Sequence, residues 1–157
     1  MKNRAILAWS GGKDSALALY EMTRQDRTQV VALLTTVTEG YDRISMHGVR
    51  RELLAEQAKA LGYPLEEVRL PQQCTNELYE QRMGQALDRA FAGRDYDEDL
   101  LKDLPPEVDP CGENGEFHTF VYAGPLFHRP VRIERGEKIL RENRFYYCDL
   151  VAGQLSR

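Results

Sequence analysis

The sequence predicts an α/β fold built on a parallel sheet, followed by a small β-rich region at the C-terminal end. Three short apolar runs in the first half have the length of buried strands. They alternate with three segments whose apolar residues recur at helical spacing. This alternating order favours parallel strands joined by right-handed crossovers. Ligands of such sheets bind beyond the carboxyl ends of the strands.

Six elements are expected in the first half of the chain. Gly62 is a natural helix end because glycine tolerates the left-handed cap, and Thr75 is placed to cap the helix that follows. Residues 40–48 are expected to form a loop, and the first strand is expected to be buried. Strands are expected at residues 5–9, 29–37 and 65–70, and helices at residues 15–24, 49–61 and 76–90. The first helix is expected to bury Ala16, Leu17, Leu19, Tyr20 and Thr23.

The composition changes after Arg89, which predicts a second part of the chain at residues 91–157 beside the α/β part at residues 1–90. Residues 95–109 are acidic and include two consecutive prolines. A turn-rich string at residues 111–122 leads into extended chain. Short strands are expected at residues 131–134 and 145–150, with a turn at 135–137 between them.

Overall composition excludes several classes of protein. The 157 residues carry a net charge of −4 and no basic stripe, so we expect no nucleic-acid partner. No apolar run approaches the length of a membrane span, so we expect no membrane partner. The three cysteines form no C-x-x-C pair, which argues against zinc and favours a reducing, cytoplasmic location.

The most informative motif is Ser-Gly-Gly-Lys-Asp-Ser at residues 10–15, called the glycine loop below. A glycine-rich turn between a strand and a helix presents backbone N–H groups at the positive end of the helix dipole, where phosphate binds. Gly11 and Gly12 allow close approach of an anion. The P-loop spacing of kinases and GTPases is absent. The alternative is a serine-glycine turn that only caps the helix.

The polar side chains of the glycine loop match a nucleotide site. The hydroxyls of Ser10 and Ser15 are donors, and Lys13 adds a mobile positive charge. Asp14 could hold a magnesium ion against the phosphates.

A second polar cluster, Glu113, Glu116 and His118, lies within six positions. Two carboxylates and an imidazole gathered by a turn can bind an amine, orient a metal or move protons. A hairpin turn with solvated acids is the alternative. The turn itself would be made by Gly112, Asn114 and Gly115.

Three blocks of sequence resemble the N-type ATP pyrophosphatases of the family that includes diphthine–ammonia ligase. They are Trp-Ser-Gly-Gly-Lys-Asp-Ser at residues 9–15, Ile-Ser-Met-His-Gly-Val-Arg at 44–50, and Asp-Pro-Cys-Gly-Glu-Asn-Gly-Glu-Phe-His-Thr-Phe-Val at 109–121, with Gly124-Pro125 following. The third block is the most specific, because several ligase families share the first, the pyrophosphate loop.

The resemblance implies an adenine nucleotide α-hydrolase-like, Rossmann-like fold and an ATP-dependent, amide-forming ligase with ATP and Mg²⁺ as cofactors. Such enzymes adenylate a carboxylate, release pyrophosphate, and let ammonia displace AMP. The implied partners are a small-molecule or protein-borne carboxylate and ammonia. Residues 1–90 would then bind the nucleotide, and residues 91–157 the substrate.

The resemblance also implies roles for individual residues. A loop histidine making a structural hydrogen bond is the alternative for His47, but the Met-His-Gly match favours a site role. The ATP phosphates would lie on Ser10, Gly11, Gly12, Lys13, Asp14 and Ser15, with Asp14 on the metal. The catalytic residues would be Lys13, Asp14, Glu113 and Glu116, and the substrate-binding residues His47, Gly48, Asn114, Gly115, Glu116 and His118.

In one respect the chain departs from that family. A long segment usual before Phe-Ala-Gly-Arg, here residues 91–94, is missing. A sheet of three parallel strands would leave an open edge, so if the deletion is real we expect either completion by a homodimer or impaired catalysis. Two functions therefore stay open: the ligase, and an ATP-binding protein without ligase activity, such as a nucleotide sensor or a remnant.

Overall fold

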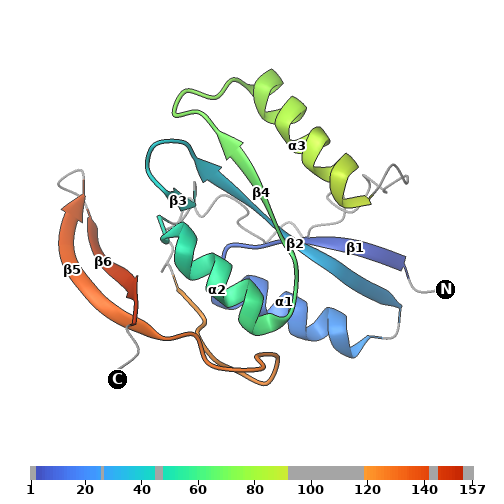
Figure 1. Cartoon of the computed structure of the whole chain (residues 1–157), viewed down its shortest axis with the longest axis horizontal. Coiled ribbons are helices and arrows are strands. Elements are labelled where there is room, and N and C mark those ends of the chain that lie inside the picture. Colours follow the sequence, from blue (N-terminus) through green and yellow to red (C-terminus); the bar gives the residue numbers. More distant parts are fainter. Residues whose placement is uncertain (1–2, 26, 45–47, 92–118, 142–144, 154–157) are drawn as a thin grey trace.

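The computed structural model describes residues 3–25, 27–44, 48–91, 119–141 and 145–153. The first half alternates strands and helices, and a two-stranded hairpin follows, so the predicted α/β class with a small β-rich region is confirmed (Figure 1). The elements are β1 (Asn3–Ala8), α1 (Lys13–Arg24), β2 (Thr28–Thr38), β3 (Arg43–Ile44), α2 (Arg51–Leu61), β4 (Leu65–Leu70), α3 (Asn76–Phe91), β5 (Ile133–Arg141) and β6 (Phe145–Ala152).

Strand β2 is the centre of the sheet. It pairs in parallel with β1 along one edge and in parallel with β4 along the other. The short strand β3 pairs antiparallel with the end of β2, opposite Val37 and Thr38. Val37 also pairs with Arg69 of β4. Strand β3 must therefore lie on the opposite edge of β2, the edge that β1 occupies along residues 28–34. The sequence-based expectation of a plain loop at residues 40–48 missed this strand.

The two faces of the sheet carry two apolar clusters. Helices α1 and α2 cover one face and α3 covers the other (Figure 1). Neighbouring residues of β2 supply both clusters, since Leu33 packs under α1 and α2 while Leu34 packs with Ala86 of α3. This alternation is the side-chain period of a strand buried on both faces.

Helix α2 carries the best-packed face of the molecule. Leu53, Leu54, Ala58 and Leu61 are buried, as the helical spacing predicted. The helix ends at Gly62, which has φ +77° and forms the left-handed cap that was expected.

The cap expected for α3 is also present. Thr75 accepts the backbone N–H of Leu78 on its hydroxyl at 3.3 Å, and its carbonyl accepts the N–H of Tyr79 at 2.9 Å.

The predicted buried faces of β1 and α1 were partly wrong. Strand β1 is half-buried at Ile6 and Leu7, because no other strand of the described residues pairs with its outer edge. In α1 only Leu19 is buried, and Leu17 is 60% exposed. The face that contacts the core runs instead at three-residue spacing through Ala16, Leu19 and Met22.

In the C-terminal half, the prediction of a turn at residues 135–137 is wrong. Strand β5 continues through these residues and pairs with β6. The register of the pairing shifts between Arg135 and Lys138, the stretch that contains Gly136. A Cβ at Gly136 would lie 3.1 Å from the Cβ of Asp149, so the two strands approach closely there.

Before the hairpin, the chain from residue 119 to 132 runs against α2. His128 donates its backbone N–H to Ala60 at 2.7 Å, and Val131 is buried in the cluster under α1 and α2. The C-terminal half therefore shares a core with the sheet.

Candidate functional site

The glycine loop leads directly from β1 into α1. Gly11 has φ +80°, a conformation that L side chains rarely adopt, and Gly12 is the N-cap of the helix. A Cβ on Gly11 would also lie 2.8 Å from both Gln57 Oε1 and Leu54 Cδ1. Glycine is therefore required at position 11 by backbone conformation and by packing on the inner side of the loop.

The two serine hydroxyls of the loop bond within it. Ser10 Oγ and Ser15 Oγ lie 3.2 Å apart, and Ser15 Oγ donates to the carbonyl of Gly12 at 3.0 Å. The N–H of Gly12 donates to Ser10 Oγ at 3.3 Å, which is a long hydrogen bond. The two half-buried serines thus hold the turn.

The charged side chains of the loop point to solvent. Lys13 Nζ lies 2.8 Å from Asp14 Oδ1 and 2.7 Å from Oδ2, and the two side chains are 61% and 84% exposed. An ion pair this exposed adds little stability, so either partner can exchange the other for a ligand.

The beginning of α1 also contacts a residue distant in sequence. The backbone N–H of Lys13 donates to Thr119 Oγ1 at 2.9 Å. The N–H groups of Asp14 and Ser15 precede the first turn of intrahelical bonds, in which Ala16 donates to Gly12. Sequence reasoning missed Thr119 as a neighbour of the loop, although the third block of the resemblance includes it.

Beneath the loop lies Gln57 of α2, a fully buried side chain that bonds to three segments. Its Oε1 accepts Trp9 Nε1–H at 2.7 Å, and its Nε2 donates to the carbonyls of Gly11 at 2.9 Å and Val121 at 2.5 Å. We call Gln57 with Trp9, Gly11 and Val121 the amide hub. Sequence reasoning missed Gln57, although an amide four residues after Leu53 on an apolar helix face was a usable signal.

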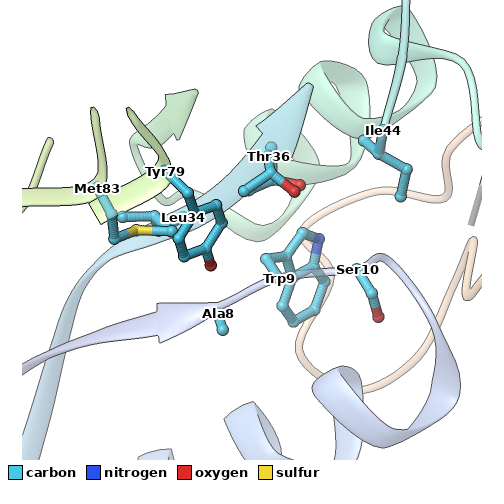
Figure 2. A pocket seen from close by; sticks show the side chains of 9 residues that line it. Ala8, Trp9, Ser10, Leu34, Thr36, Ile44, Tyr79 and Met83 are labelled. Atoms are coloured by element: carbon cyan, nitrogen blue, oxygen red, sulfur yellow. The ribbon is translucent and has the colours of Figure 1, made fainter. Parts of the chain in front are cut away.

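A pocket of about 360 Å³ opens beside the glycine loop, beyond the end of β1 (Figure 2). Figure 2 shows Tyr79 and Met83 of α3 on one side and Trp9 and Ser10 on the other. The lining residues are Ala8, Trp9, Ser10, Leu34, Thr35, Thr36, Ile44, Tyr79 and Met83. The carboxyl ends of the parallel strands therefore form a mostly apolar pocket next to the loop, as the topology predicted.

The sheet edge is open at this pocket. Along the edge of β2 that faces β1, pairing with β1 stops at Leu34 and pairing with β3 starts at Val37. The carbonyl of Leu34 accepts the N–H of Trp9 at 2.7 Å. Because alternate residues of a strand face the same edge, the backbone of Thr36 faces the gap. The pocket thus offers backbone hydrogen bonds between apolar walls.

Some predicted site residues lie outside the described residues. These are His47, Glu113, Asn114, Gly115, Glu116 and His118. Gly48 is described, with φ +65°, and its carbonyl accepts Arg43 Nη1 at 2.7 Å. Its backbone N–H donates to the carbonyl of Ile44 at 3.1 Å, and its predicted substrate role stays a prediction.

The same region carries a charged cluster that we call the Asp149 anchor. Asp149 of β6 accepts two hydrogen bonds from Arg43, at 3.0 and 3.1 Å, and two from Arg50, at 3.1 and 2.6 Å. Burial by itself would raise the pKa of Asp149, but the bonds and charges of the two arginines hold that pKa well below its usual range.

Within the described ranges, no three His, Cys, Asp or Glu side chains gather into a site that could hold a metal ion. Asp14 is the carboxylate of the glycine loop, and its exposed oxygens could still contribute to a site completed by a ligand. None of the helices in the described part of the chain is long and apolar enough to span a membrane.

Comparison with known proteins assigns the family. The model of the diphthamide synthase N-terminal domain matches residues 2–97, and that of the diphthamide synthase C-terminal domain matches residues 77–152. A search of curated proteins gives no match. The two family models together span both halves of the fold, and the resemblance predicted from the sequence is confirmed. The chain belongs to the diphthamide synthase family, the diphthine–ammonia ligase family of the N-type ATP pyrophosphatases.

Proposed function

We propose that the chain binds ATP with its phosphates on the glycine loop and its base in the neighbouring pocket, and uses it to form an amide from a carboxylate and ammonia. The observation that carries this proposal is the direct continuity of loop and pocket, since Ser10 belongs to both. Membership of the diphthamide synthase family supports an ATP-dependent ligase.

The phosphate part of the site fits an anion on three grounds. The start of α1 presents N–H groups at the positive end of the helix dipole. Gly12 at the N-cap has no side chain with which to cap the helix. Lys13 is exposed and can leave Asp14 for a phosphate. The hydroxyl of Thr119 now accepts the N–H of Lys13, so we propose that a phosphate oxygen replaces or joins it there.

The pocket fits a flat, aromatic base. Its walls include the side chains of Trp9, Leu34, Met83 and Tyr79, and Tyr79 is 42% exposed. The backbone of Thr36 at the sheet edge supplies a donor and an acceptor in one plane, which is what an adenine edge requires. A volume of about 360 Å³ lies within the range of small-molecule sites.

Asp14 is the described residue that would hold magnesium. Mg²⁺ commonly takes one or two protein carboxylates together with phosphate oxygens and water, so a single exposed aspartate is a sufficient protein contribution. Bound there, the ion would supply positive charge to the phosphates and the leaving pyrophosphate. Lys13 would then move from Asp14 to a phosphate oxygen.

We propose that the acceptor carboxylate and ammonia bind at the segment of the sequence that carries Glu113, Glu116 and His118. Support comes from chain connectivity, because Thr119 directly follows His118 in the sequence and contacts the glycine loop. A carboxylate oxygen of the acceptor would attack the α-phosphorus and pyrophosphate would leave. Ammonia would then attack the acyl carbon, and AMP would leave as the nitrogen loses a proton. Acidic side chains suit ammonium or an amine better than a triphosphate.

The test is release of pyrophosphate from ATP by the whole chain with Mg²⁺, ammonium and a diphthine-bearing protein substrate. We expect release that depends on the acceptor, loss of release in Glu116→Gln, and near-normal ATP binding in that variant. Normal turnover by Glu116→Gln would contradict the acceptor site. ATP binding without any pyrophosphate release would favour the alternative of a nucleotide-binding protein without ligase activity.

A further inference from the structure

The amide hub uses the complete hydrogen-bonding capacity of the Gln57 nitrogen. Both N–H bonds of Nε2 have acceptors, the carbonyls of Gly11 and Val121, and Oε1 accepts Trp9 Nε1–H. Trp9 Nε1 can only donate and the two carbonyls can only accept. A flipped amide would place Nε2–H against the donor Trp9 Nε1–H and Oε1 against the two carbonyl oxygens. Only one orientation of the Gln57 amide is therefore compatible with its partners.

The hub fixes one peptide plane of the glycine loop. The carbonyl of Gly11 accepts from Gln57 Nε2 at 2.9 Å and from the backbone N–H of Val121 at 2.9 Å. Both lone pairs of that oxygen are therefore directed towards the interior. In a planar trans peptide the C=O and the following N–H point in opposite directions. The N–H of Gly12 consequently points away from Gln57, to the side where Ser10 Oγ lies.

This peptide would not hold that direction unaided. It joins two glycines, whose backbones adopt left- and right-handed conformations with similar ease. A flipped peptide would present the carbonyl oxygen of Gly11 to the anion side, where it would repel phosphate. The difference between the two orientations is the difference between a donor and an acceptor at one position of the phosphate site.

We infer that Gln57 is a positioning residue of the glycine loop: it holds the Gly11 carbonyl inward and thereby aims the Gly12 N–H at phosphate. This inference rests on the proposed function, in that phosphate is taken to be the ligand. Gln57 performs the task without a charge of its own. A carboxylate at position 57 would face the carbonyls of Gly11 and Val121 and drive them away.

Gln57→Met tests the inference, because methionine has a similar length and no amide. We expect two decisive changes in this variant. The residual dipolar coupling of the Gly12 N–H in solution should no longer fit the orientation seen here, and ATP affinity by calorimetry should fall about tenfold or more, as for loss of a hydrogen bond to a charged group. The emission of Trp9, the single tryptophan, should also shift because its partner is gone.

Val68→Ala is the matched control. Val68 is buried in the other cluster, under α3, and touches no part of the hub. It should lower the melting temperature yet leave the Gly12 coupling unchanged. If Gln57→Met does not fold, Gln57→Asn keeps the amide but shortens its reach, and the same two changes are expected.

The inference is overturned if the Gly12 coupling is the same in the folded variant as in the wild type, whatever happens to affinity. It is also overturned if the coupling changes and ATP binds as tightly as before, or if Val68→Ala changes the Gly12 coupling to the same extent. A wild-type chain that binds no ATP would refute the proposed function, and the Gly12 coupling would still decide the role of Gln57.

Discussion

Two places bring distant parts of the chain together, and they do so with opposite chemistry. The amide hub connects α2, the glycine loop and Val121 through one neutral, fully buried carboxamide. The Asp149 anchor connects β6 to Arg43 and Arg50 through four hydrogen bonds between charged groups. Both are long-range contacts, separated by 46 residues between Gly11 and Gln57 and by 106 between Arg43 and Asp149.

The difference in chemistry between the two contacts follows from the surroundings of each. A charged residue under the glycine loop would change the potential felt by a phosphate, whereas an amide orients the loop and leaves that potential nearly unaltered. The anchor lies at Gly48, whose carbonyl also accepts Arg43, and not beneath the glycine loop. Its strength comes from the charges of Asp149 and the two arginines, and Asp149 loses its charge when it is protonated. Acid should therefore loosen the hairpin before it disturbs the loop.

The largest expected effect is that of Asp149→Asn on stability. Removing one partner of a buried ion pair costs about 3 kcal/mol or more, because the remaining charges lose their compensation. We expect about 3 kcal/mol, at the lower end of that range, since the side chain of Arg50 is 39% exposed. Chemical unfolding measures it.

Glu56→Gln provides the control, because Glu56 pairs with Lys59 and Arg129 at the surface. It should change stability by at most about 1 kcal/mol. Equal losses from both variants would remove the distinction between the anchor and an ordinary surface ion pair.

Acid should act through the same carboxylate. The folded-state pKa of Asp149 lies well below the unfolded value of about 3.9, so its contribution is present above that pH and is lost as the pH falls below it towards the folded pKa. The free energy of unfolding should decline more steeply below about pH 4 in the wild type than in Asp149→Asn. Parallel curves would show that other carboxylates dominate the acid response.

Lys13→Ala should affect ligand binding and leave stability almost unchanged. Its ammonium is exposed and bonds only to Asp14 in the described structure, so the fold does not depend on it. Loss of a charged hydrogen bond to phosphate should weaken ATP binding by roughly 1.5–3 kcal/mol. Calorimetry showing unchanged affinity would remove the glycine loop from the phosphate site.

The smallest expected effect is that of Asp14→Asn, and it concerns magnesium dependence. If Asp14 serves the metal, the variant should lose most of the gain in ATP affinity that Mg²⁺ confers on the wild type, while metal-free binding stays the same or improves slightly. The comparison requires titrations with and without Mg²⁺. Equal losses under both conditions would identify Asp14 as a residue of the helix start alone.

Local sequence patterns predicted the helices and strands best where residues close together in the sequence determine the structure. The buried face of α2, its end at Gly62 and the Thr75 cap were all predictable, since spacing and backbone conformation act within a few residues. The turn expected at residues 135–137 failed because a glycine in a paired strand can produce a bulge as easily as a turn, and only the register with β6 decides which. Leu17 failed similarly, because an apolar residue is buried only where a neighbour covers it.

The sequence by itself determined the α/β class, the family and the position of the glycine loop, because each depends on residue types that are close together along the chain. Tertiary structure alone decided that Gln57 lies beneath Gly11 and that Thr119 accepts the N–H of Lys13. It also decided that Asp149 pairs with two arginines. These contacts join residues 46 to 106 positions apart, and no periodicity encodes them. The packing of α2 and of residues 119–132 against the sheet brings them together, and hydrogen-bond geometry then selects the partners.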